Sequence, residues 1–143
     1  MTGYAMGESL DRAGGIRDQL RPLFNRADLQ MVLLFGSHAV GEARHDSDID
    51  LALLGDRPLD LVSLTTEMIR LLKQSRVDLV DLRRASPLLL MEVVRKGILL
   101  YERTPGSYLE FCSLAVRRYI DTKKLREARK TAIERFLEQR GLS

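Results

Sequence analysis

Hydrophobic residues follow two kinds of spacing along this chain of 143 residues. Segments that are apolar throughout, or at every second position, indicate strands, which we expect over 31–35, 47–54, 77–80 and 98–101. Apolar residues three and four positions apart indicate helices, which we expect after Gly14-Gly15, over 61–72 and 87–96, and from Pro105 onward. This order of elements predicts a single α/β layer structure with helices packed on a small sheet.

Particular residues mark where the helices begin, bend and end. Asp60 and Ser86-Pro87 are typical of helix starts, and Gly97 is typical of a helix end. Pro22 predicts either a kink or the first turn of a shorter helix. The apolar stripe of the C-terminal helix drifts in phase, which predicts a bend or break at Asp121-Thr122.

The chain divides into three parts. Residues 1–13 are rich in glycine and polar side chains, so we expect a flexible N-terminus there. Residues 14–104 hold all the expected strands and form the predicted domain, while residues 105–143 form a helical extension packed on it. The length is sufficient for one domain with a real hydrophobic core.

Composition narrows the class of protein. Hydrophobic residues make up 45% of the chain and charged residues 30%, which is typical of a soluble globular domain. Cys112 is the only cysteine, so no intramolecular disulfide can form, in keeping with a cytoplasmic location. No apolar run approaches the ~20 residues that span a bilayer, so no membrane association is expected.

The net charge of +3 is too small to indicate nucleic-acid binding, and none is expected. Its distribution is uneven, because residues 105–143 contain nine Lys and Arg against five Asp and Glu. The basic surplus therefore belongs to the C-terminal helical segment. It is either a solvated helix face or a surface for a partner.

The motif that indicates chemistry is Gly36-Ser37, followed by ten residues and then Asp48-Ile49-Asp50. Two carboxylates two residues apart on a strand lie on the same face, where they repel unless a cation lies between them. Mg²⁺ held by one or two carboxylates and by substrate phosphates satisfies this requirement. A Gly-Ser turn that opens a short helix can hold a phosphate. The spacing therefore predicts nucleotidyl transfer.

Other polar residues near this motif are weaker candidates for the nucleotide or metal site. Arg44 is either a phosphate contact or a solvated loop residue, and Ser47 directly precedes the acidic pair. His38 and His45 have no His or Cys partner at the spacing of metal ligands. The chain has neither a Walker A lysine motif nor an arrangement typical of Ser-His-Asp hydrolysis.

Residues 36–54, which read GSHAVGEARHDSDIDLALL, resemble the signature of the polymerase-β-like nucleotidyltransferase superfamily. The whole chain is similar to its minimal (MNT) branch, most of all to the MntA-type antitoxins that pair with HEPN-domain toxins; the VDLVDL strand and the helix-Gly-ILLYE segment add to the likeness. The resemblance implies a mixed sheet flanked by helices, with Gly36 and Ser37 holding a triphosphate. It also implies that Asp48 and Asp50 bind two Mg²⁺ ions, with Asp78 as the third carboxylate.

Asp78 and Asp81 compete for the role of the third carboxylate. Strand alternation places them on opposite faces, and Asp81 lies where the strand gives way to Arg83-Arg84. We therefore favour Asp78, which can accept or steer the proton of an attacking hydroxyl. Either residue can instead be a charge at the edge of the core.

The resemblance implies an Mg²⁺-dependent protein adenylyltransferase that transfers AMP from ATP to a hydroxyl, in the family a tyrosine, of a cognate HEPN ribonuclease toxin. The preference for ATP comes from the family alone. Two alternatives stay open: a small-molecule nucleotidyltransferase, and an antitoxin that neutralises its toxin by binding alone.

Overall fold

The computed structural model describes residues 2–42 and 47–142. Its strands are β1 (Leu29–Phe35), β2 (Ile49–Gly55), β3 (Val77–Asp81) and β4 (Ile98–Glu102), which form one sheet in the order β3-β2-β1-β4. β1 runs antiparallel to β2 and β4, whereas β2 and β3 are parallel. The sheet is therefore mixed, as expected, and the predicted strands are confirmed to within about two residues at each end.

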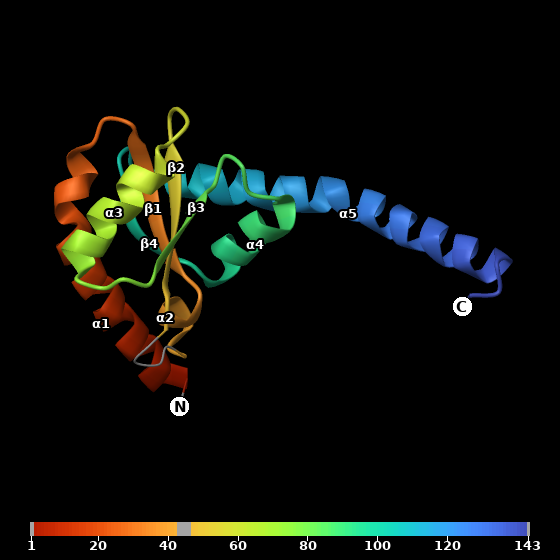
Figure 1. The fold of residues 1–143 in the computed structure, drawn as a ribbon, viewed down its shortest axis with the longest axis horizontal. Coiled ribbons are helices and arrows are strands. Elements are labelled where there is room, and N and C mark those ends of the chain that lie inside the picture. The colour runs from red at the N-terminus through yellow and green to blue at the C-terminus, as the bar shows by residue number, and fades with distance from the viewer. Residues whose placement is uncertain (1, 43–46, 143) are drawn as a thin grey trace.

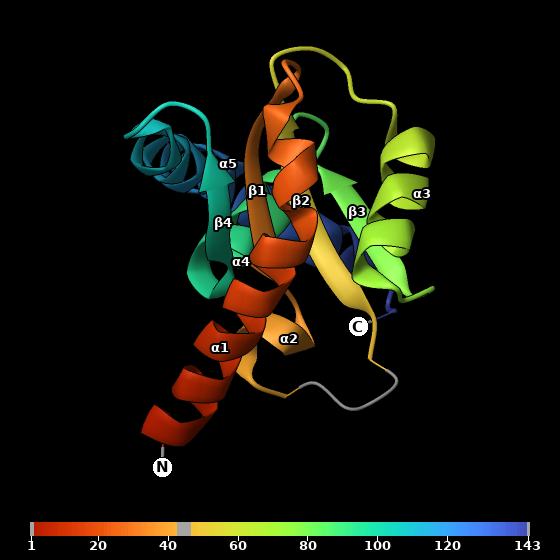
Figure 2. The same ribbon diagram turned by 90° about the vertical axis from the view of Figure 1, so that its left-hand side faces the viewer.

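Helices cover both faces of the sheet (Figures 1 and 2). On one face, α1 (Thr2–Leu20) and α3 (Leu61–Leu72) pack their apolar stripes against alternate strand residues. On the other face lie α4 (Pro87–Lys96) and the beginning of α5 (Ser107–Gln139). Burial on both faces explains why Met31 to Leu34 of the central strand β1 are all apolar and fully buried.

The expected helix boundaries are present. The carboxylate of Asp60 accepts a hydrogen bond from the Ser63 amide at 3.2 Å, and the hydroxyl of Ser86 accepts one from the Leu89 amide at 3.2 Å. The Gly97 amide closes α4 on the Val93 carbonyl at 2.7 Å. Pro22 lies in the first turn of a separate 3₁₀ helix, Arg21–Asn25, the second of the two outcomes it predicted.

The N-terminal helix differs from the prediction, because α1 begins at Thr2 rather than after Gly14-Gly15. Two glycines inside a helix cost about 1 kcal/mol each, but the buried stripe of Ala13, Ile16 and Leu20 anchors the helix on either side of them. The Arg17 guanidinium adds hydrogen bonds to the carbonyls of Leu100 at 2.9 Å and Leu99 at 3.0 Å. Burial thus outweighs local propensity.

The predicted bend at Asp121-Thr122 is wrong, because α5 is one continuous helix that extends away from the sheet (Figure 1). Only Phe111 and Ala115, near its start, are buried. Beyond Ala115 the helix packs on no hydrophobic core among the described residues. A shift of the apolar stripe around the helix therefore loses no buried surface there and requires no bend. No helix among the residues that the structure describes is long and apolar enough to cross a membrane.

Candidate active site

The acidic residues of the motif lie at the beginning of β2. Asp50 is half-buried in the strand and Asp48 is exposed just before it. In the parallel ladder Asp50 is the register partner of Asp78 on β3, so these two carboxylates project from the same face of the sheet. Asp81 instead pairs with Leu53, a residue of the opposite face. The expected alternation of Asp78 and Asp81 is confirmed.

Asp81 is buried, and its side chain has a structural partner. Its Oδ1 accepts a hydrogen bond from the Arg83 amide at 3.0 Å, at the turn that ends β3. Asp78 is exposed and lies beside Asp50. Of the two candidates for a third carboxylate, the one beside Asp50 is Asp78.

The carboxylates lie close enough to perturb one another. Burial raises the pKa of Asp50 above its ordinary value, and the negative charges of Asp78 and Asp48 raise it further. An acid whose ionised form is disfavoured in this way gains from a nearby cation. The electrostatics of the site therefore favour a metal ion.

Gly36 brings the turn of the motif against the acidic pair. Its φ is +73°, in the left-handed region, and a Cβ built on it would lie 2.2 Å from Oδ2 of Asp50. No side chain fits there, so the backbone of the turn and the Asp50 carboxylate are in direct contact. Ser37 follows as the first residue of the short helix α2 (Ser37–Val40). The two halves of the sequence motif thus form one site.

His38 has a role that the sequence did not indicate. The ring is buried, and its Nδ1 lies 2.9 Å from Nη1 of Arg12, which can only donate. Nδ1 therefore accepts, and Nε2 carries the proton toward the carbonyl of Ser47 at 3.3 Å. Gln74 Nε2 donates to the same carbonyl at 3.1 Å. His38 thus links α1 to the residue before Asp48; the contact with Arg12 joins positions 26 apart, beyond any local pattern.

The remaining expected site residues are placed as follows. Ser47 lies directly before Asp48 and is held through its carbonyl. Arg44 and His45 lie outside the described residues. Within residues 2–42 and 47–142, no three His, Cys, Asp or Glu side chains form a group that could hold a metal ion by themselves. Mg²⁺ commonly takes one or two carboxylates and completes its shell with water and substrate phosphates, so an open set such as this one fits that ion.

Comparison with known proteins agrees with this geometry. The family described as "Polymerase beta, Nucleotidyltransferase" matches residues 18–105. Protein adenylyltransferase MntA of Shewanella oneidensis is 42% identical over 76 residues, which span 51% of this chain and 54% of that protein, about half its length. Protein adenylyltransferase MntA of Aphanizomenon flos-aquae is 29% identical over 135 residues, 86% of this chain and 90% of that protein.

Solved structures extend the match to nearly the whole fold. A toxin–antitoxin crystal structure with AMP-PNP contains a chain with a TM-score of 0.70 and 32% identity, covering 85% of this chain and 98% of that one. A structure of the tri-AMPylated Shewanella oneidensis HEPN toxin with its MNT antitoxin has a TM-score of 0.65 and 29% identity, covering 88% of this chain and 98% of that one. The mixed sheet and its flanking helices are those of a nucleotidyltransferase.

Proposed function

Because this chain belongs to the polymerase beta nucleotidyltransferase family, we propose that it is an antitoxin that transfers AMP from ATP to a hydroxyl of a cognate HEPN ribonuclease toxin and thereby neutralises it. The observation that supports this most is the contact of the Gly36 turn with Asp50, beside Asp78. That arrangement sets a phosphate-binding turn against a pair of carboxylates. We also propose a cytoplasmic location, because ATP is available there and a lone cysteine stays reduced.

In the proposed reaction the chain's own residues orient both reactants. The backbone of Gly36 and the hydroxyl of Ser37 hold the triphosphate, with Ser47 and Arg44 as further contacts. The acceptor oxygen attacks the α-phosphorus, the bond to the bridging oxygen of the β-phosphate breaks, and pyrophosphate leaves with the electron pair. Asp78 accepts the proton of the attacking hydroxyl. Two Mg²⁺ ions, bound by Asp48, Asp50 and Asp78, would neutralise the triphosphate and the charge that develops at the α-phosphorus.

Two parts of the chain have separate tasks in this proposal. Residues 14–104 carry the nucleotide and metal site, and residues 105–143 supply a surface for the partner. The chain itself needs no direct contact with nucleic acid, since the ribonuclease activity belongs to the toxin.

Pyrophosphate release tests the proposed function. The chain is mixed with ATP, Mg²⁺ and its cognate HEPN protein, and pyrophosphate is measured over time. Release should require all three additions and stop when EDTA removes the metal. Neutralisation of the toxin without any pyrophosphate release would show that the chain acts by binding alone.

Gly36→Ala is expected to reduce AMP transfer by at least about tenfold, because its Cβ would lie 2.2 Å from Asp50 Oδ2. The backbone at Gly36, with φ +73° and ψ −157°, lies in a region that is essentially restricted to glycine, which adds a strain of about 1–3 kcal/mol to the loss of stability. Gly14→Ala is the matched control, because a Cβ there meets nothing within 4 Å and should leave transfer unchanged. Initial rates and thermal unfolding of both variants measure the effect. Wild-type transfer by Gly36→Ala would show that the turn tolerates displacement.

His38→Ala is expected to raise the Mg²⁺ concentration needed for half-maximal transfer, because it removes one of the two side-chain hydrogen bonds to the Ser47 carbonyl next to Asp48. Loss of a buried partner should also cost about 1–3 kcal/mol of stability. His38→Gln retains a side-chain donor and should recover part of the Mg²⁺ dependence. A loss of stability in His38→Ala with no change in Mg²⁺ dependence would limit His38 to a role in folding.

The basic part of α5 is expected to speed association with the toxin. Lys123, Lys124 and Lys130 are exposed, whereas the Arg126 guanidinium stacks on the Tyr119 ring at 4.8 Å and is already occupied. Replacing the three lysines by glutamine should slow association and weaken its salt dependence, with nucleotide affinity unchanged. Stopped-flow mixing at two salt concentrations measures this. An unchanged association rate at low salt would show that these lysines form a solvated helix face with no role in binding the toxin.

A further inference from the structure

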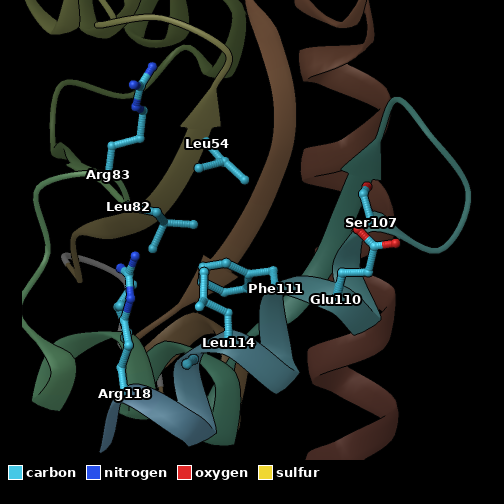
Figure 3. A pocket seen from close by; sticks show the side chains of 10 residues that line it. Leu54, Leu82, Arg83, Ser107, Glu110, Phe111, Leu114 and Arg118 are labelled. Carbon is cyan, nitrogen blue, oxygen red and sulfur yellow. The ribbon is translucent and has the colours of Figure 1, made fainter. Parts of the chain in front are cut away.

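A groove lies on the same face of the sheet as Asp50 and Asp78, at the opposite end of the same two strands. Its floor includes Leu54 of β2 and Leu82 just after β3, each four positions beyond one of the two acids. At about 3.3 Å per residue, the groove begins about 13 Å from the carboxylates. The start of α5 forms its other wall (Figure 3), and its volume is about 530 Å³.

The groove combines an apolar floor with charged edges. Leu82 and Phe111 are buried beneath it, and Leu114 is 38% exposed along its side. Figure 3 shows Arg83 and Arg118 on one side and Glu110 with Ser107 on the other. Within the described part of the chain, neither guanidinium forms an ion pair or a side-chain hydrogen bond. Two exposed and unpaired guanidiniums beside an apolar floor suit a carboxylate attached to an apolar group.

We propose that this groove docks the acceptor protein, by taking an apolar side chain on its floor and a neighbouring carboxylate between Arg83 and Arg118. The inference rests on the proposed function, which requires a protein to present a hydroxyl near Asp78. An open groove suits a protein segment better than a small ligand, which is commonly buried over most of its surface. Arginines and aromatic residues are also the side chains that most often anchor protein interfaces.

The charges along this face would orient the acceptor. The catalytic end carries Asp48, Asp50 and Asp78, and the groove carries Arg83 and Arg118, so an acidic segment is attracted to the groove and repelled from the catalytic carboxylates. An extended peptide covers 13 Å in about four residues. The docked carboxylate therefore lies about four residues from the modified hydroxyl if the acceptor segment is extended.

The test is a charge reversal in the groove, Arg83→Glu with Arg118→Glu. Its control is Arg57→Glu with Arg95→Glu, two exposed arginines that make the same charge change and do not line the groove. We expect the groove variant to raise the KM for the HEPN protein at least about tenfold, with kcat and the affinity for AMP-PNP unchanged. The control should stay within about twofold of wild type.

Leu114→Gln provides a second variant that keeps every charge and removes an apolar wall of the groove; it should also raise KM. Equal effects of the groove and control variants would show that Arg83 and Arg118 act only through long-range attraction and not by binding the acceptor in the groove. That result would overturn the proposal. Loss of AMP-PNP affinity in the groove variant would assign the groove to the nucleoside and would also overturn it. Failure of the proposed function can be distinguished from failure of the groove proposal. If the proposed function fails, the wild-type chain transfers no AMP. The affinity of the groove and control variants for the HEPN protein, measured without nucleotide, still tests the groove.

Discussion

Replacing either Asp48 or Asp50 by asparagine is expected to reduce AMP transfer to background. In the proposed mechanism each substitution removes one of the three carboxylates that would hold the metal ions, and the described residues contain no group of three His, Cys, Asp or Glu that offers another site. Radiolabelled AMP incorporation into the HEPN protein, at saturating Mg²⁺ and ATP, measures the loss. Asp56→Asn removes an exposed carboxylate after β2 and should transfer AMP like wild type. Near-normal transfer by both Asp48→Asn and Asp50→Asn would overturn the metal site.

The same substitution at Asp50 should stabilise the metal-free protein. Because the pKa of Asp50 is raised in the folded chain, the folded state binds this proton more readily than the unfolded state does. The stability that this group contributes therefore rises as the pH falls through its pKa in the folded state. The increase is complete once the pH is below 3.8, the ordinary pKa that the group has in the unfolded chain. Asp50→Asn removes this dependence and should raise Tm in EDTA at neutral pH. A lower Tm would show that the carboxylate has a stabilising partner.

Asp78→Asn is expected to lower AMP transfer by at least about a hundredfold while nucleotide binding survives, since loss of a general base commonly costs that much. Asp81→Asn should have a much smaller effect, because Asp81 faces away from Asp50 and its Oδ1 accepts from the Arg83 amide, a bond that asparagine can keep. Single-turnover rates and AMP-PNP affinities separate chemistry from binding. The reverse order of effects would assign the catalytic role to Asp81.

Much of the fold follows from local pattern. The four strands and the caps at Asp60 and Ser86 were predictable because each depends on residues close together in the chain. The choice of Asp78 as the third carboxylate came from the family resemblance, and strand alternation placed Asp81 on the opposite face, as the structure has it. These are the features for which sequence spacing and spatial position are directly related.

The rest depends on contacts between distant segments. The second half of α1 is fixed by burial of Ala13, Ile16 and Leu20 and by hydrogen bonds from Arg17 to β4, despite Gly14 and Gly15. The link from Arg12 through His38 to Ser47 arises only when α1 and α2 pack together. The straight course of α5 reflects the absence of anything to pack against beyond Ala115 in the described structure, which a stripe in the sequence does not reveal.

The most direct measurement is the intact mass of the HEPN protein after incubation with this chain, ATP and Mg²⁺. Transfer catalysed at Asp48, Asp50 and Asp78 requires discrete increases of one adenylyl group each, which disappear in EDTA and with Asp48→Asn. An unchanged mass in a toxin that the chain has nevertheless neutralised would contradict the enzyme and leave an antitoxin that acts by binding.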